Sequence, residues 1–126
     1  YIPESSFPVG CVAVLENGLA VPGVNVEHPD WTRILCAERN VAGTVASYGL
    51  PPISRLYLSC PEDPAGSPCG ACRQVLAELA PGSTIVMDRN PGAAETTTPE
   101  KLLPGSFTGT ALLRKRLPRT DDDRRT

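Results

Sequence analysis

Three cysteines of this chain stand where a loop gives way to a predicted helix. Cys69 and Cys72 lie at the start of CGACRQVLAELA, and Cys36 opens CAERNVAGTVAS. The first turn of a helix carries unpaired N–H groups and partial positive charge, which favour the thiolate form of a cysteine. Pro68 suits a helix start because its missing N–H is not needed there. Two such helix starts, side by side at one edge of a sheet, would bring three thiolates together.

The rest of the chain alternates between strand and helix patterns. Strands are predicted at residues 7–15, 19–27, 53–60 and 83–88, and helices at residues 36–47 and 69–80. Residues 16–18, Glu-Asn-Gly, predict a hairpin between the first two strands, so that the sheet is mixed. Residues 89–98 favour a turn with a short edge strand, and residues 99–107 a helical turn. We expect an α/β domain with a mixed sheet of about five strands and helices on both faces.

The length and composition indicate one ordinary globular domain. We place it at residues 1–113 of the 126, followed by a charged tail at residues 114–126. The net charge of −2 gives no general reason to bind nucleic acid or an anionic membrane. No apolar run approaches the about 20 residues that span a bilayer, and no signal peptide is visible. Five cysteines are an odd number, which favours reduced thiols and a cytoplasmic location over a disulfide-paired secreted domain.

Three thiolates suit Zn²⁺ in a tetrahedral site, and the fourth position decides what the site does. A fourth protein ligand would make the site structural, whereas an open position holding water would make it catalytic. The candidates for a fourth ligand are Cys11, Cys60 and His28. We favour an open site, because Cys11 lies mid-strand among apolar neighbours, no second ligand lies beside Cys60 in the sequence and His28, the only histidine, lies in a loop.

Glu38 follows Cys36 by two residues, in the first turn of the same predicted helix. Two interpretations stand level on spacing alone. A carboxylate in this position often does no more than complement the helix dipole. It could equally act as a general base beside a metal-bound water.

The pair of motifs CAER and PCGACRQ, some thirty residues apart, resembles the zinc-dependent cytidine deaminase superfamily. FPVG near the start, GVNVE in the second strand and LLPGSF near the end resemble the small homotetrameric class, in the same order. Together these stretches cover most of residues 1–107. The resemblance implies a three-layer α/β/α fold, one Zn²⁺ per chain and a homotetramer with shared active sites.

The resemblance also implies a reaction, the hydrolytic deamination of cytidine and 2′-deoxycytidine to uridine and 2′-deoxyuridine, with release of ammonia, in pyrimidine salvage. Cys36, Cys69 and Cys72 would hold the zinc. Glu38 would carry a proton from water to ring nitrogen 3 of cytosine and then to the departing amine. The partner of the protein is then a small nucleoside.

Six further residues resemble substrate contacts of this class. Asn25 and Glu27 stand two apart on a predicted strand and so share a face, where by resemblance they grip the ribose. Phe7 by resemblance stacks on the pyrimidine. The plainer alternatives are a solvated strand face for the first two and core packing for Phe7.

The other three contacts of this kind are Ala37, Ser67 and Phe107. The backbones of Ala37 and Ser67 would contact the base and the leaving ammonia. Phe107 by resemblance reaches the pocket of a neighbouring subunit, so that the site is complete only in the oligomer. Its plainer role is a hydrophobic anchor for the C-terminal segment.

Three thiolates give a zinc site a formal charge of −1, which weakens the metal as a Lewis acid. Arg39 and Arg73 each follow a motif element by one residue and are candidates to draw off this charge through hydrogen bonds to the ligands. The alternative for both is a surface arginine.

The sequence leaves several alternative functions open. The loop HPDWTRIL at residues 28–35 departs from the family pattern beside the sugar-binding pair, which leaves a deaminase of a modified or antibiotic nucleoside, such as blasticidin S, as an alternative. Such enzymes resemble NVY where this chain has NVE, so Glu27 favours an ordinary ribose. Polynucleotide deamination would need a basic, aromatic groove, and the chain has only six aromatic residues. A structural zinc module or a dithiol oxidoreductase would leave Glu38 without a role.

Overall fold

A computed structural model describes residues 1–3, 5, 7–30, 33–61, 67–89 and 92–107. The predicted domain end at residue 113 and the charged tail lie outside the described residues, as does Trp31 of the loop that departs from the family pattern. None of the described helices has the length and apolar character needed to cross a bilayer.

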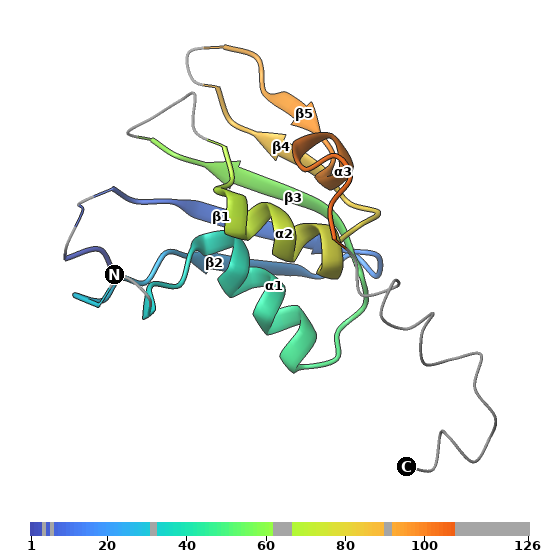
Figure 1. The fold of residues 1–126 in the computed structure, drawn as a ribbon. Coiled ribbons are helices and arrows are strands. Elements are labelled where there is room, and N and C mark those ends of the chain that lie inside the picture. Colours follow the sequence, from blue (N-terminus) through green and yellow to red (C-terminus); the bar gives the residue numbers. More distant parts are fainter. Residues whose placement is uncertain (4, 6, 31–32, 62–66, 90–91, 108–126) are drawn as a thin grey trace.

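The core of the fold is one mixed sheet of five strands in the order β2-β1-β3-β4-β5 (Figure 1). Its strands are β1 (Gly10–Leu15), β2 (Ala20–Val24), β3 (Ile53–Ser59), β4 (Thr84–Met87) and β5 (Glu95–Thr97). β1 pairs antiparallel with both β2 and β3, β3 pairs parallel with β4, and β4 pairs antiparallel with β5. The predicted mixed sheet is therefore confirmed, including the hairpin and the short edge strand. The predicted second strand ends early, at Val24, and Val26 forms only an isolated bridge with Leu35.

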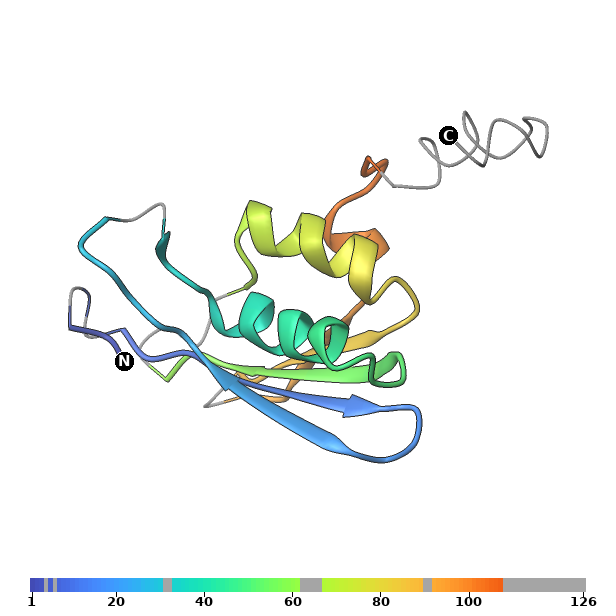
Figure 2. The same ribbon diagram turned by 90° about the horizontal axis from the view of Figure 1, so that it is seen from below.

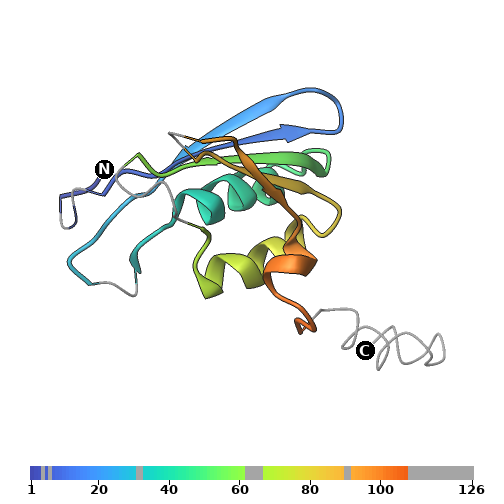
Figure 3. The ribbon, with the colours of Figure 1, turned by 90° about the horizontal axis from the view of Figure 1, so that it is seen from above.

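Three helices complete the described fold: α1 (Ala37–Ser47), α2 (Gly70–Leu79) and α3 (Pro99–Leu102). α1 connects β2 to β3, and α2 connects the parallel pair β3 and β4. Seen from below and from above, all three helices lie on the same face of the sheet (Figures 2 and 3). The expectation of helices on both faces is thus not met within the described residues. Strand alternation predicts which side chains of a strand face the core, but it does not show whether helices cover the opposite face of the sheet.

The buried core lies between the sheet and α1 and α2. Alternate residues of β1, namely Cys11, Ala13 and Leu15, point toward the helices, as the two-residue period of a strand requires. Val41 of α1 and Leu76 of α2 meet them. The core therefore fixes both helices against the central strands.

The opposite face of the sheet is apolar and partly open. Val12, Val24 and Tyr57 are exposed there, and they line a hollow of about 630 Å³ together with Val86. This hollow is larger than the cleft described below, but neither Glu38 nor any of Cys36, Cys69 and Cys72 lines it. The chemistry therefore belongs to the helical face.

The backbones of β2 and α1 approach each other closely at Gly23. A Cβ atom built at this position would lie 2.5 Å from Cγ2 of Val41 and 3.0 Å from the carbonyl oxygen of Ala37. Only glycine fits here without displacing the helix. Because α1 begins directly after Cys36, this contact also fixes the position of Cys36 relative to the sheet.

We expect Gly23→Ala to lower the free energy of unfolding by about 1–3 kcal/mol, the usual effect of overpacking. Gly43→Ala is the matched control on α1, the helix that Gly23 approaches, because a Cβ atom there meets nothing within 4 Å. It should leave stability unchanged or raise it by up to about 1 kcal/mol through helix propensity. Urea unfolding measures both, and equal stability of the two variants would contradict the close approach.

Candidate active site

The three cysteines of the motifs meet where α1 and α2 begin. Cys36 is the N-cap of α1 and Cys69 is the N-cap of α2, and both have extended backbones. The sulfur of Cys69 accepts a hydrogen bond from the N–H of Cys72 at 3.4 Å. The ligand atoms of the three residues all lie within 4.8 Å of one another. Both predicted helix starts, and the cluster expected from them, are therefore confirmed.

This donor set fits Zn²⁺. Zinc bound to thiolates at about 2.3 Å in a tetrahedral site keeps its sulfurs about 3.8 Å apart. The sulfurs of Cys69 and Cys72 already lie 3.2 Å apart, so that a small rearrangement would admit the ion. No histidine, cysteine or carboxylate elsewhere in the described part of the chain joins the group as a fourth member.

The three residues considered as fourth ligands have other surroundings. Cys11 is 2% exposed in the core, where burial, followed by the charges of Glu38 and Cys60, raises the pKa of its thiol to about 12. His28 lies in an exposed loop, where its Nδ1 accepts a hydrogen bond from the N–H of Asp30 at 2.9 Å. Cys60 lines the cleft near the cluster without belonging to it. These positions support the open metal site.

The sulfurs of the pair differ in how readily they ionise. Desolvation acts to raise the pKa of the Cys69 thiol, but hydrogen bonds from Cys72 and Cys36 outweigh it, and the pKa is lowered. For Cys72, burial together with the hydrogen bond to Cys69 and the charge of Glu38 raises the pKa. Cys69, the more exposed of the two, is therefore the first of the pair to become a thiolate.

The two candidate arginines take up different roles. Nη2 of Arg39 lies 3.5 Å from the sulfur of Cys36 and donates to the carbonyl of Ile34 at 3.0 Å. The hydrogen bond to Cys36 is the main reason that the pKa of Arg39 is raised. Arg73 donates instead to Ser67, Pro68 and Leu102. Within the described residues, its hydrogen bonds reach none of the three sulfurs.

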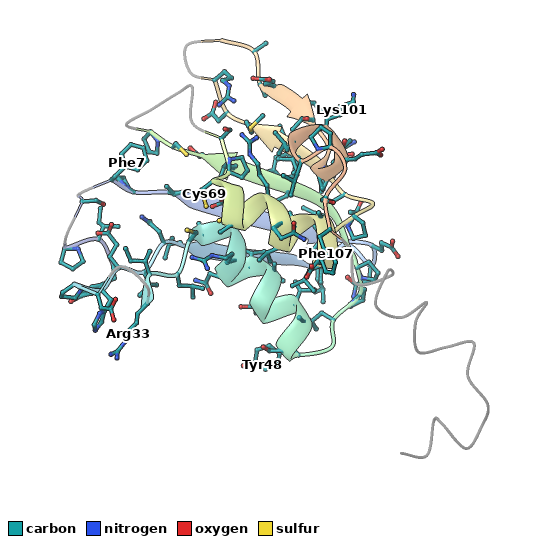
Figure 4. The ribbon with its side chains drawn as sticks, in the orientation of Figure 1. Phe7, Arg33, Tyr48, Cys69, Lys101 and Phe107 are labelled. Carbon is teal, nitrogen blue, oxygen red and sulfur yellow. The ribbon has the colours of Figure 1, made fainter. Side chains whose placement is uncertain are left out.

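A cleft of about 390 Å³ opens beside the cluster, within the size range of small-molecule sites. Most of the predicted site residues line it: Phe7, Asn25, Cys36, Ala37, Glu38, Ser67 and Cys69. They come from the segment before β1, the end of β2 and the starts of α1 and α2. Figure 4 shows Phe7 and Cys69 on the same side of the molecule.

Glu38 lies in the first turn of α1 and is only 5% exposed. Its carboxylate makes no hydrogen bond or ion pair with the described residues, although it lines the cleft. Its negative charge acts on the thiols of Cys11, Cys69 and Cys72. A buried carboxylate without a partner, facing a cleft, is available to take up a proton from a bound molecule.

The predicted sugar-binding pair also holds the N-terminal segment. Oδ1 of Asn25 accepts from the N–H of Val9 at 3.0 Å, and its Nδ2 donates to the carbonyl of Phe7 at 2.9 Å. Oε1 of Glu27 accepts from the N–H of Ser5 at 3.0 Å. Asn25 lines the cleft, whereas Glu27 is not among the residues of its lining. The pair thus supports the wall that carries Phe7.

Phe107 lies apart from the cleft of its own chain. Figure 4 shows it toward the far end of α2, away from Phe7 and Cys69. Its side chain is 60% exposed, and its carbonyl accepts a hydrogen bond from Nε2 of Gln74 at 2.6 Å. A large aromatic ring held in this exposed position is available to another chain.

Four residues that complete the wall of the cleft were not predicted from the sequence as wall residues. These are Val9, Ile34, Leu58 and, as a wall residue rather than a ligand, Cys60. Leu58 and Cys60 stand two apart at the carboxyl end of β3, where ligands commonly bind in open sheets. That rule was the available signal for them. Val9 and Ile34 carry no such signal.

The chain was compared with known proteins. The family model described as cytidine and deoxycytidylate deaminase zinc-binding region matches residues 1–88. A cytidine deaminase of Sporosarcina psychrophila is 41% identical over 85% of this chain and 79% of its own, and one of Halalkalibacterium halodurans is 36% identical over 86% and 83%.

Solved structures agree with the sequence relatives. The cytidine deaminase of Burkholderia pseudomallei superposes with a TM-score of 0.77 at 32% identity, over 85% of this chain and 87% of that one. The Mycobacterium tuberculosis enzyme gives a TM-score of 0.71 at 33% identity, over 85% and 84%. With the three-sulfur cluster and its free carboxylate in place, the chain belongs to the cytidine and deoxycytidylate deaminase family, whose members are zinc-dependent hydrolases.

Proposed function

We propose that this protein catalyses the hydrolytic deamination of cytidine and 2′-deoxycytidine. The observation that carries the proposal is the placement of the unpartnered carboxylate of Glu38 beside three clustered sulfurs, in a cleft of about 390 Å³. The relatives named above are cytidine deaminases, which supports the same substrate class. A structural zinc module has no use for a buried free carboxylate, since burial without a partner is unfavourable.

Cys36, Cys69 and Cys72 would hold the zinc ion. When bound, Zn²⁺ supplies Lewis-acid activation of a water molecule at neutral pH. Glu38 receives a proton from this water and delivers it to ring nitrogen 3 of cytosine. The water oxygen then forms a bond to carbon 4, and its remaining proton passes through Glu38 to the exocyclic amine. The bond from carbon 4 to that nitrogen breaks, and ammonia leaves the uracil nucleoside.

Arg39 offsets part of the charge that three thiolates give the site. Its guanidinium lies against the sulfur of Cys36 and is anchored by the carbonyl of Ile34. Its Nε is buried without a hydrogen-bond partner in the described residues. A cation held in this way withdraws electron density from the sulfur and keeps the metal electrophilic.

The base of the substrate would lie against Phe7 and its sugar beside Asn25. Phe7 offers a ring to stack on the pyrimidine, and Asn25 and Glu27 offer groups to the ribose hydroxyls. In the absence of substrate, the amide of Asn25 and the carboxylate of Glu27 bond to backbone groups of the N-terminal segment. Substrate binding would therefore exchange some of these bonds for bonds to the sugar.

We further propose that the active enzyme is a homotetramer in which Phe107 of one chain completes the cleft of another. The exposure of Phe107 and its distance from its own cleft support this arrangement. A ring from a second chain would close the open side of the cleft and exclude water from the base. Each site would then contain residues of two chains, and each chain would donate one ring and receive another.

Glu38→Gln should lower turnover of cytidine by about a hundred- to ten-thousand-fold, the usual contribution of a general base. The zinc content should stay at about one ion per chain, because the amide removes the proton carrier but no ligand. Ammonia release from cytidine, deoxycytidine and blasticidin S, with zinc measured in the same samples, tests both statements. Glu16→Gln, in the exposed hairpin turn, is the control and should behave as wild type. Full zinc without turnover in the wild-type protein would instead indicate a structural module.

Removal of zinc with a chelator should expose Cys69 to iodoacetamide at pH 7, because this sulfur is accessible and its pKa is lowered. The rate at which Cys69 is labelled should fall as the pH falls, since the thiolate is the reactive form. Cys11 is the internal reference: it is buried, and a pKa of about 12 keeps it a thiol. Peptide mass spectrometry measures both sites. If added zinc gave Cys69 no protection, this sulfur would not be a ligand.

Shared sites predict complementation between two variants of lowered activity. Phe107→Ala should lower activity about tenfold, the loss expected of an aromatic contact. After subunits of this variant and Glu38→Gln are dissociated, mixed and reassembled, about a quarter of the sites should combine an intact carboxylate with an intact ring. Activity should rise accordingly. A mixture of Glu38→Gln with Cys36→Ala is the control, since both defects lie in one chain's own metal site; equal recovery there, or none in the test mixture, would contradict shared sites.

A further inference from the structure

Arg73 makes three hydrogen bonds that meet around one guanidinium. Its Nε donates to the carbonyl of Pro68 at 2.8 Å, its Nη1 to the carbonyl of Leu102 at 2.9 Å, and its Nη2 to Oγ of Ser67 at 3.0 Å. Ser67 and Pro68 form the approach to α2, and Leu102 ends α3. One side chain therefore joins the wall of the cleft to a segment about thirty residues further along the chain.

The next residue holds the other end of that segment. Nε2 of Gln74 donates to the carbonyl of Phe107 at 2.6 Å and also to Oε1 of Glu78 at 3.0 Å. Arg73 and Gln74 directly follow Cys72, the most deeply buried of the three clustered cysteines. Two neighbouring residues near the start of α2 thus hold residues 102–107 by a hydrogen bond at each end.

Leu102 packs against the hydrophobic core, and the N–H groups of Leu102 and Leu103 bond within α3, but the part of the segment beyond them is less well held in the described structure. α3 has only four residues, and a hollow of about 310 Å³ lies between Ala77 of α2 and Leu103, Gly105 and Ser106. Gly105 turns the chain with a φ of 64°, a conformation that other residues rarely adopt. Packing alone therefore does not define where Phe107 is presented.

We infer that Arg73 is a positioning residue that fixes the Ser67 wall of the cleft and the segment ending in Phe107 relative to the metal-binding end of α2. Three acceptors, each reached by a different nitrogen of Arg73, suit the fork of a guanidinium, which a lysine ammonium cannot reproduce. This assignment replaces the expectation that Arg73 draws charge from the sulfurs. Its consequence for turnover rests on the proposed function, whereas its consequence for residues 102–107 does not.

The test compares Arg73→Lys, which keeps the charge, with Arg73→Gln, which removes it. Both should raise KM for cytidine about tenfold, because the wall and the ring that receive the substrate are displaced. The value of kcat should change less than about threefold and zinc should stay at about one ion per chain, because no sulfur loses a partner. Arg55→Gln, on the exposed side of β3, is the control for loss of one positive charge and should match wild type.

Two kinetic outcomes would overturn the inference. If Arg73→Lys restored wild-type kinetics while Arg73→Gln did not, the charge would matter and the fork would not. If both variants lost kcat at unchanged KM, together with thermal stability, Arg73 would serve only folding.

Amide hydrogen exchange gives a readout that does not depend on activity. The N–H groups of Leu102 and Leu103 bond to the carbonyls of Thr98 and Pro99. Both Arg73 variants should exchange these amides about tenfold faster than wild type, with α1 unaffected. If the wild-type protein failed to deaminate cytidine, the proposed function would fall, yet the exchange result would still decide whether Arg73 anchors the segment. Unchanged exchange in both variants would reject the anchor.

Discussion

The meeting of two helix N-termini above one end of the sheet is the constraint on which the rest of this structure depends. Cys36 and Cys69 each cap a helix, and the core contacts of those helices bring the sulfurs together. The N–H groups of the first turns point toward the cluster and favour negative charge there. The close approach at Gly23 and the packing of Val41 set the position of one helix, and the crossover from β3 to β4 sets the other.

Charge is distributed unevenly around this point. Three sulfurs and the buried carboxylate of Glu38 concentrate negative potential, and Arg39 is the cation whose hydrogen bond reaches a sulfur. A divalent ion relieves the repulsion among these groups, so metal binding and proper placement of Glu38 reinforce each other. The second arginine supplies geometry rather than charge, since its donors are used on two carbonyls and a hydroxyl. Arg39 and Arg73 each follow a motif element by one residue, yet within the described part of the chain only the hydrogen bonds of Arg39 include a sulfur of the cluster.

The sequence predicted the local features well, because each depends on neighbours in the chain. Helix starts at the cysteines, the hairpin after Leu15 and the short strand at Glu95–Thr97 all follow from nearby residues. The partners of Arg73 and Gln74 lie about thirty residues away, and no spacing rule reports them. The same holds for the contacts between Asn25 and the segment before β1, and for the single face that the described helices occupy. Long-range partners follow from the assembled fold and were beyond pattern analysis.

The bonds of Asn25 give that residue two tasks at once. Its amide closes a small ring with the backbone on either side of Pro8, which holds the aromatic wall of the cleft in register with the edge of the sheet. In the proposed binding mode, replacing it would loosen recognition of the base as well as of the sugar. Selectivity for the two halves of a nucleoside would then be coupled through one side chain, and a variant that accepts a bulkier sugar would also become less discriminating toward the pyrimidine.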